Sequence, residues 1–399
     1  MRKINVGYLI LLGFGMLLVA CKEVNSETAV PLEKQISKVR QKYAPDKRVA
    51  IFQVDAVRYN NDYVLKGESN LPSAVDELKE KLKLEHISFV DSIQLLPDTA
   101  LNGMTQGVIR VSVANLRSHP AHSAELATQA TLGTPVKIYK KDGSWYLIQT
   151  PDHYISWVDH GGLELMSEQE FSRWKSVRKL IFLGTYGNSF AQPNVNSQTV
   201  TDLVAGDILE KIGEEGDFYR VSYPDGRMAY IEKSMSKPYE KWLKSINPTE
   251  ESLVNTSKTL MGLPYLWGGT SPKGVDCSGF TKTIYFLNGM VIPRDASQQI
   301  ATGQEVDSTK NFEKLRPGDL LFFGKSATDS TEERVVHVGM WIGNDEFIHS
   351  SGDVHISSMN KSAPNYDEYN YDRYLRSQRL LNVQDKALVD LSQKDIFKD

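Results

Sequence analysis

An internal duplication constrains the fold of this chain more than any other feature of its sequence. Residues 133–158 align without a gap with residues 206–231, at a constant offset of 73 residues. Each copy has a Gly-x-Trp/Phe-Tyr motif, a Pro-Asp turn and an aromatic-aliphatic ending, with apolar and polar residues alternating over short segments. Such segments, broken by Gly, Pro and Asp, are typical of small β-barrels. The middle of the chain is therefore predicted to hold two copies of one barrel.

Both copies resemble bacterial SH3-like domains, which often open as the first copy does, with Ala-Asn-Leu-Arg at residues 114–117. We expect the first domain at 105–165 and the second at 166–238. The region before them, 21–104, is predicted to be a tether followed by a small α/β domain. It is expected to contain a strand over 48–59, a helix over 72–84 and a further strand over 87–96. It carries no catalytic signature, so a packing or positioning role is expected.

The first residues are typical of an export signal. Arg2 and Lys3 precede an apolar run over residues 6–20, which is shorter than the roughly 20 residues of a membrane span. The run ends in Leu-Val-Ala-Cys at 18–21, which resembles the lipobox of bacterial lipoproteins. That resemblance implies loss of residues 1–20 and a lipid on Cys21 that anchors an exported protein to a bacterial membrane. An ordinary signal peptide cut nearby is the alternative.

Cysteine usage and charge narrow the possible functions. The chain has two cysteines, Cys21 and Cys277. If Cys21 carries lipid, Cys277 has no disulfide partner within the chain, and a lone thiol in an exported protein is a candidate reactive group. The formal net charge of −4 argues against a nucleic-acid partner, because such proteins normally show a basic excess.

Cys277 is predicted to lie in the first turn of a helix. A glycine-rich stretch ends just before it, and Phe280, Ile284 and Leu287 then follow at helical spacing. The unpaired N–H groups and the positive dipole end of a helix N-terminus favour a thiolate, which is the attacking form of cysteine. We therefore expect this position to lower the pKa of the thiol.

Two histidines are placed to assist such a thiol. Residues 335–343 and 346–350 are predicted to pair as a hairpin around Asn344 and Asp345, which can bring His337 and His349 together. A nucleophile needs a base that a third group orients, so we expect His337 to be the base and His349 to orient it. A metal site of Cys277 and the two histidines is a weak alternative because their spacing matches no compact zinc motif. No cofactor is expected.

Five motifs occur in one order: Tyr-x-Trp-Gly-Gly, Asp-Cys-Ser-Gly-Phe, Arg-Pro-Gly-Asp-Leu, His-Val-Gly and Phe-Ile-His-Ser. As a set, over about residues 250–375, they resemble the NlpC-type family of papain-like cell-wall peptidases. The paired SH3-like domains and Pro-Arg-Asp-Ala-Ser at 293–297 narrow the resemblance to the γ-D-glutamyl-L-diamino acid endopeptidases, or dipeptidyl-peptidase VI. It implies an α+β multidomain fold with a papain-like domain at 239–399.

The same resemblance implies an activity and a site. Cys277 would be the nucleophile, His337 the base and His349 the third catalytic residue. The substrates would be peptidoglycan stem peptides, cut between γ-D-glutamate and diaminopimelate or lysine during cell-wall turnover or recycling. The pocket for a free N-terminal L-alanine would be formed by Asp276, Ser278, Asp295, Ala296, Glu125 and Tyr154. Ala296 stands where relatives often have Ser, which removes one expected hydrogen bond. Asp276 could instead only cap its helix, and Asp295 only mark a turn.

Two functions of other classes remain open from the sequence. One is a wall-binding adhesin in which the SH3-like repeats act and the peptidase domain is inert; the intact Cys and two His argue against it. The other is an acyltransferase on a papain-like fold, which would transfer the acyl group to an acceptor other than water.

Overall fold

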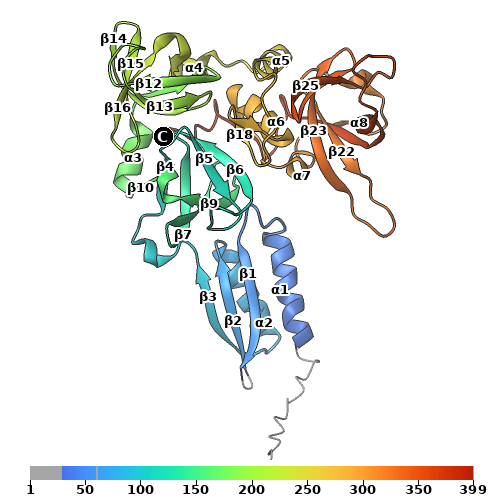
Figure 1. Cartoon of the computed structure of the whole chain (residues 1–399). Helices are drawn as coiled ribbons and strands as arrows, with labels where there is room; N and C mark the ends of the chain where they lie inside the picture. The colour runs from blue at the N-terminus through green and yellow to red at the C-terminus, as the bar shows by residue number, and fades with distance from the viewer. Residues whose placement is uncertain (1–28, 60–61, 399) are drawn as a thin grey trace, which may run out of the picture.

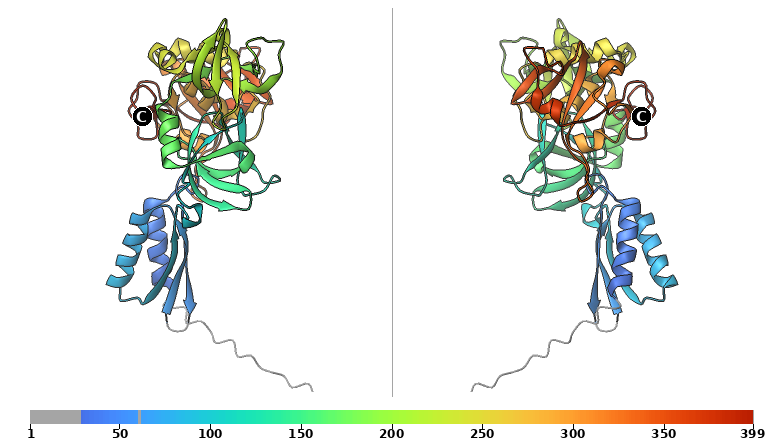
Figure 2. Two further views of the ribbon diagram at one scale, coloured as in Figure 1. Left: turned by 90° about the vertical axis from the view of Figure 1, so that its left-hand side faces the viewer. Right: turned by 90° about the vertical axis from the view of Figure 1, so that its right-hand side faces the viewer.

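The computed structural model describes residues 29–59 and 62–398. The predicted export signal and Cys21 lie outside the described residues. Figure 1 shows four parts: an N-terminal unit (residues 29–95), a first barrel (106–166), a second barrel (179–238) and a C-terminal domain (239–398). The N-terminal unit projects away from the other three, and both side views in Figure 2 agree on this. None of the helices in the described residues has the length and apolar character needed to cross a membrane.

The N-terminal unit is a three-stranded sheet covered by two helices. Its elements are α1 (Ala29–Tyr43), β1 (Phe52–Tyr59), β2 (Asp62–Ser69), α2 (Pro72–Leu84) and β3 (Phe89–Leu95). Strand β1 pairs antiparallel with β2, whereas β2 and β3 run parallel, so α2 forms the crossover that a parallel pair requires. The predicted helix over 72–84 is confirmed, with Val75, Leu78 and Leu82 buried on one face. The first predicted strand begins at Phe52 rather than at residue 48.

Each barrel is a seven-stranded antiparallel sheet with the same topology. The first has β4 (Gln106–Ile109), β5 (Val113–Arg117), β6 (Leu126–Thr131), β7 (Pro135–Asp142), β8 (Trp145–Gln149), β9 (Ile155–Asp159) and β10 (Leu163–Met166). The second has β11 (Lys179–Phe182), β12 (Tyr186–Phe190), β13 (Thr199–Val204), β14 (Ile208–Glu215), β15 (Phe218–Ser222), β16 (Met228–Glu232) and β17 (Ser236–Pro238). Reading each sheet from its hairpin edge gives β6-β5-β9-β8-β7-β4-β10 and β13-β12-β16-β15-β14-β11-β17. The predicted duplication is therefore confirmed strand by strand.

Equivalent glycines confirm the duplication at the level of single turns. Gly143 and Gly216, which the repeat aligns, both have positive φ angles, of 56° and 53°. Gly133 and Gly206 are also equivalent, with φ angles of 83° and 96°. A helix that the sequence analysis did not identify, α3 (Glu168–Ser176), joins the two barrels and begins with a capping box.

The C-terminal domain packs helices against a six-stranded sheet of order β21-β26-β22-β23-β24-β25. Its strands are β21 (Gln304–Asp307), β22 (Leu320–Lys325), β23 (Arg334–Gly343), β24 (Glu346–Ser351), β25 (Asp353–Ser358) and β26 (Tyr374–Arg379). Its helices are α4 (Tyr239–Ser245), α5 (Glu250–Thr259), α6 (Cys277–Leu287), α7 (Ala296–Gln299) and α8 (Glu368–Asp372). Helix α6 contributes Cys277, Phe280 and Ile284 to the buried core between it and β23–β24.

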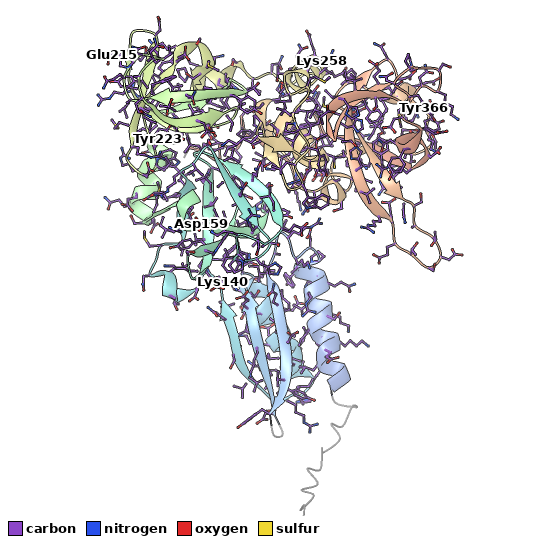
Figure 3. All side chains as sticks on the ribbon, in the orientation of Figure 1. Lys140, Asp159, Glu215, Tyr223, Lys258 and Tyr366 are labelled. Carbon is purple, nitrogen blue, oxygen red and sulfur yellow. The ribbon has the colours of Figure 1, made fainter. Side chains whose placement is uncertain are left out.

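Specific polar contacts hold the parts together. Gln129 on β6 accepts hydrogen bonds from the Thr270 N–H and the Ser271 hydroxyl of the C-terminal domain, at 3.0 and 2.9 Å. Lys140, labelled in Figure 3, lies where the first barrel meets the N-terminal unit and forms an ion pair of 2.6 Å with Glu68. The first barrel therefore contacts both the N-terminal unit and the C-terminal domain.

Gly133→Ala and Gly143→Ala are a matched pair that tests the contact between the barrels. At Gly133 a Cβ would lie 2.1 Å from the carbonyl oxygen of Ile208, whereas nothing lies within 4 Å at Gly143. We expect Gly143→Ala to lower the free energy of unfolding by about 1 kcal/mol because of its positive φ. Gly133→Ala should cost roughly 3 kcal/mol or more because backbone must also move. Denaturant unfolding of both variants measures the difference, and equal costs would contradict the contact.

Candidate active site

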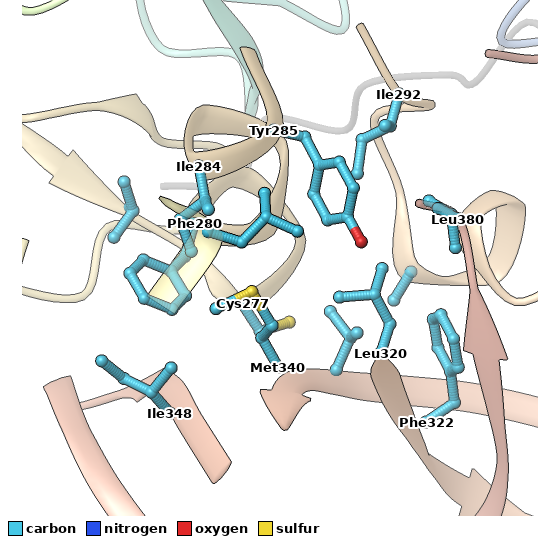
Figure 4. Close-up of a cluster of buried hydrophobic side chains, with 14 of the residues drawn as sticks. Cys277, Phe280, Ile284, Tyr285, Ile292, Leu320, Phe322, Met340, Ile348 and Leu380 are labelled. Carbon is cyan, nitrogen blue, oxygen red and sulfur yellow. The ribbon is translucent and has the colours of Figure 1, made fainter. Parts of the chain in front are cut away.

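Cys277 is the first residue of α6, as predicted. The two short strands before it, β18 (Thr270–Ser271) and β19 (Gly274–Val275), form a tight hairpin. Asp276 is the N-cap of the helix and accepts a hydrogen bond of 2.7 Å from the Gly279 N–H. Cys277 is 8% exposed, and Figure 4 shows it among buried apolar side chains that include Met340. The thiol therefore lies at the boundary between the core and the cleft described below.

The predicted hairpin does bring the two histidines together. His337 on β23 and His349 on β24 are both buried, and His337 Nε2 lies 2.8 Å from His349 Nδ1. His349 Nε2 lies 3.0 Å from the hydroxyl of Ser357 on β25, a residue that the sequence analysis missed. His355 pairs with His349 across the two strands. Ser357 lies two residues after His355 and therefore on the same face of β25. This spacing is the sequence signal for Ser357.

Burial determines the charge state of this group. Burial raises the pKa of the Cys277 thiol to about 12, although the backbone N–H groups of Val338 and Ser278 bond to it and act in the opposite direction. The expectation that the pKa of this thiol lies below its usual value is therefore wrong for the structure, because burial outweighs the helix N-terminus. Burial and the neighbouring His349 hold the pKa of His337 well below its usual range. Burial lowers the pKa of His349 to about 3. All three side chains are consequently neutral at pH 7.

A cavity of about 520 Å³ opens beside Cys277. Its lining includes all six predicted substrate-binding residues: Asp276, Ser278, Asp295, Ala296, Glu125 and Tyr154. Glu125 and Tyr154 come from the first barrel and the others from the C-terminal domain. Within residues 29–59 and 62–398, there is no group of three or more His, Cys, Asp and Glu side chains that could hold a metal ion.

The carboxylate of Asp276 is bonded on all sides by protein groups. Arg294, which is 1% exposed, donates to it from Nη1 at 3.0 Å and forms an ion pair with its other oxygen. The Gly268 N–H donates to the same carboxylate at 2.9 Å. The same Nη1 of Arg294 also donates to the Ser278 hydroxyl at 2.9 Å. Arg294 belongs to the Pro-Arg-Asp-Ala-Ser motif, but no role was predicted for it from the sequence. Its signal there is a basic residue directly before Asp295.

The carboxylates of Asp295 and Glu125 face the cavity in different charge environments. Asp295 accepts a hydrogen bond of 3.3 Å from the Tyr154 hydroxyl and one of 2.7 Å from Arg48 Nη1. Glu125 accepts a hydrogen bond of 2.6 Å from the Trp267 indole N–H. Among the described residues, no cationic side chain forms an ion pair with Glu125. Sequence reasoning missed Arg48, because nothing in its local sequence indicates a distant partner.

The site contains a thiol, a pair of hydrogen-bonded imidazoles and a cavity lined by acidic side chains. A neutral thiol can pass its proton to a neutral imidazole within reach when an electrophilic carbonyl is bound. Glu125 supplies a negative charge, and the Tyr154 hydroxyl a neutral group, at one end of the cavity. The site is therefore suited to acyl transfer from a ligand that carries a positive group.

Comparisons with known proteins agree with the geometry. The model of the NlpC/P60 family matches residues 262–373, and that of the bacterial SH3 domain matches residues 112–164. A γ-D-glutamyl-L-lysine dipeptidyl-peptidase of Bacillus cereus is 33% identical over 240 residues, which are 57% of this chain and 67% of that protein. Dipeptidyl-peptidase 6 of Lysinibacillus sphaericus is 25% identical over 268 residues, which are 65% of this chain and 93% of that protein.

A solved structure shows the same architecture. The crystal structure of an NlpC/P60 family protein from Bacillus cereus superposes with a TM-score of 0.57 at 28% identity, covering 69% of this chain and 99% of that one. The expected fold class is confirmed: SH3-like barrels precede a papain-like domain in an α+β chain. The chain is a cysteine peptidase, and it belongs to the NlpC/P60 family.

Proposed function

We propose that this enzyme hydrolyses the bond between γ-D-glutamate and an L-diamino acid in peptidoglycan stem peptides that begin with a free L-alanine. One observation carries the proposal: Cys277 shares its cavity with Glu125 and Tyr154 of the first barrel and with Asp295. The names of the relatives above support it, since one is a γ-D-glutamyl-L-lysine dipeptidyl-peptidase. Such a reaction would serve cell-wall turnover or recycling, outside the cytoplasm.

The proposed chemistry begins with a proton transfer from a neutral pair. His337 Nδ1 takes the thiol proton of Cys277 as the sulfur attacks the γ-carbonyl carbon of the substrate. For that, His337 must carry its own proton on Nε2, which it donates to His349 Nδ1 across 2.8 Å. His349 must then carry its proton on Nε2 and donate it to the Ser357 hydroxyl across 3.0 Å. Ser357 and His349 therefore set the tautomer of the base.

The remaining steps return the enzyme to its starting state. The tetrahedral intermediate places its negative charge near the backbone N–H of Cys277 at the start of α6. His337 gives its proton to the departing amine of the diamino acid, and a thioester to Cys277 remains. His337 then takes a proton from a water molecule that attacks the thioester, and the dipeptide acid leaves as the thiol regains its proton. Hydrolysis, rather than acyl transfer, follows when water is this second nucleophile.

The acidic end of the cavity would recognise the ammonium group of L-alanine. Glu125, which has no cationic partner among the described residues, and the Tyr154 hydroxyl are its proposed ligands, with Asp295 beside them. Charge-assisted hydrogen bonds of this kind are about twice as strong as neutral ones. Asp276 would act mainly through Arg294 and the helix start, because its oxygens already accept five hydrogen bonds or ion pairs from protein groups. Arg334 lines the same cavity and offers a cation for a substrate carboxylate.

Cys277→Ala should abolish hydrolysis of L-Ala-γ-D-Glu-L-Lys, with kcat falling by a factor of about 10⁴ or more because the nucleophile is lost. Mass spectrometry of the products measures release of lysine and of the dipeptide. Cys21→Ser is the matched control, since it removes the other cysteine of the chain and should keep full activity. A Cys277→Ala enzyme with a tenth of the wild-type rate would refute the assignment of Cys277 as the nucleophile.

The neutral resting state predicts how Cys277 reacts with iodoacetamide. Because burial raises the pKa of the thiol to about 12, the thiolate fraction should increase tenfold for each pH unit between about pH 7 and 10. The rate of alkylation at Cys277, located by mass spectrometry in the unliganded enzyme, should follow that increase without a plateau. An alkylation rate that is already constant from pH 5 to 8 would instead indicate a thiolate–imidazolium pair.

We further propose that Cys21 carries a lipid that anchors the exported enzyme to a bacterial membrane. The support is the lipobox-like ending of the apolar run at residues 18–21. Wild-type protein should incorporate a fatty-acid probe and partition with membranes, and Cys21→Ser should do neither. Detection of the probe on Cys21→Ser, or an unlabelled wild type, would refute the anchor.

A further inference from the structure

Arg48 reaches from the N-terminal unit into the cavity beside Cys277. It lies between α1 and β1, and its carbonyl oxygen accepts a hydrogen bond of 2.7 Å from the Ile155 N–H of β9. That bond places Arg48 next to Tyr154, the neighbour of Ile155. Its guanidinium then donates from Nη1 to Asp295 at 2.7 Å and to the Ser297 hydroxyl at 2.9 Å. One residue thus connects the three parts: its backbone bonds to the first barrel and its side chain to the C-terminal domain.

The guanidinium of Arg48 is held rigidly by these partners. Its Nε and Nη2 bond to the two oxygens of Asp46, each at 2.8 Å. Asp46 is itself fixed by Gln298 Nε2, at 2.8 Å. A guanidinium has five N–H donors, and four hydrogen bonds to Asp46, Asp295 and Ser297 engage Arg48. Because protein groups occupy its donors, Arg48 acts as a fixed wall rather than as a ligand waiting for substrate.

A second cavity adjoins the one beside Cys277 at Arg48. Its volume is about 500 Å³, and it lies between the N-terminal unit and the first barrel. Four residues line both this cavity and the one beside Cys277: Arg48, Ser118, Ala127 and Tyr154. Lys47, Lys140 and Trp157 line only the second cavity. The four shared residues therefore form the boundary between the two cavities, and Arg48 is the only charged residue among the four.

We propose that the Arg48–Asp295 ion pair closes the amine end of the cleft and confines the enzyme to peptides with a free amino terminus. This inference rests on the proposed function above. A group on the amine of L-alanine, such as the acyl link to glycan in uncut peptidoglycan, would have to enter the second cavity through Arg48. Displacing the guanidinium would leave the Asp295 carboxylate without its nearest cation. The free-energy cost of that loss would disfavour binding of a peptide whose amine is blocked. The N-terminal unit is thereby part of the active site, and Arg48 is a specificity-determining residue.

The test compares full-length variants on L-Ala-γ-D-Glu-L-Lys and on its N-acetyl derivative. In the wild type, kcat/KM should favour the free peptide by about 100-fold. In Arg48→Ala and in Arg48→Met this preference should fall by about tenfold or more, mainly through a lower KM for the acetylated peptide. Arg48→Lys, which keeps a cation at the wall, should restore most of the preference. Lys47→Ala is the matched control, because it removes a neighbouring cation that lines only the second cavity.

The outcomes separate this inference from the proposed function. If the wild type cleaves neither peptide, the proposed function itself is wrong. If it cleaves the free peptide selectively and both Arg48→Ala and Arg48→Met keep the wild-type preference, the wall is refuted while the function stands. Equal cleavage of both peptides by the wild type also refutes the wall. Thermal unfolding of each variant identifies loss of folding. Arg48→Met keeps the length of the side chain, so it still reports the preference in kcat/KM if Arg48→Ala does not fold.

Discussion

The buried ion pair of Asp276 and Arg294 is the interaction on which the rest of the site depends. Asp276 caps α6 through the Gly279 N–H and also accepts from the Gly268 N–H. Arg294, 1% exposed, extends the same network to the Thr128 hydroxyl of the first barrel at 2.9 Å. Removing either partner of such a pair leaves an uncompensated buried charge, at a cost of about 3–5 kcal/mol. One pair thus fixes the start of the helix that carries Cys277 and the barrel that faces it.

This ion pair also explains why Asp276 has a structural role whereas Glu125 can bind a ligand. Both oxygens of Asp276 are committed to the helix start, the preceding loop and Arg294. Among the side chains that the structure describes, only the Trp267 indole bonds to Glu125, so the charge of Glu125 is available to a ligand in the cavity. Since Glu125 belongs to the first barrel, that barrel is a wall of the cavity as well as a separate folded domain. Its docking through Gln129 on Thr270 and Ser271 is therefore a condition for a complete site.

The relative sizes of two opposing effects, the helix N-terminus and burial, determine whether Cys277 is charged in the resting enzyme. A charge near a helix N-terminus gains about 0.3–1 kcal/mol, and up to about 2 kcal/mol when partly buried. One pKa unit corresponds to about 1.4 kcal/mol, so the helix lowers the pKa of a thiol by roughly one unit. Burial in an apolar core acts in the opposite direction with a larger effect, and it raises the pKa of this thiol to about 12. The helix alone therefore does not ionise the thiol, and the proposed reaction relies on His337 to take its proton.

Sequence alone determined the elements and their chemistry wherever the information was local. The repeat of 73 residues predicted two sheets of one topology, since the glycines at the turns and the apolar alternation lie in the chain itself. The spacing after Cys277 predicted α6, and the hairpin around Asn344 and Asp345 predicted the contact of His337 with His349. Motif resemblance placed all six predicted pocket residues, and each of them lines the cavity.

Tertiary structure alone decided which of these residues are free to act. Arg48 and Asp295 are 247 positions apart, and no periodicity or motif connects two such residues, because only the docking of three folded parts brings them within 2.7 Å. Ser357 became the partner of His349 through the pairing of β24 with β25. The pKa of Cys277 depended on how many apolar side chains close around it, which is a property of packing and not of the residues next to it in the chain.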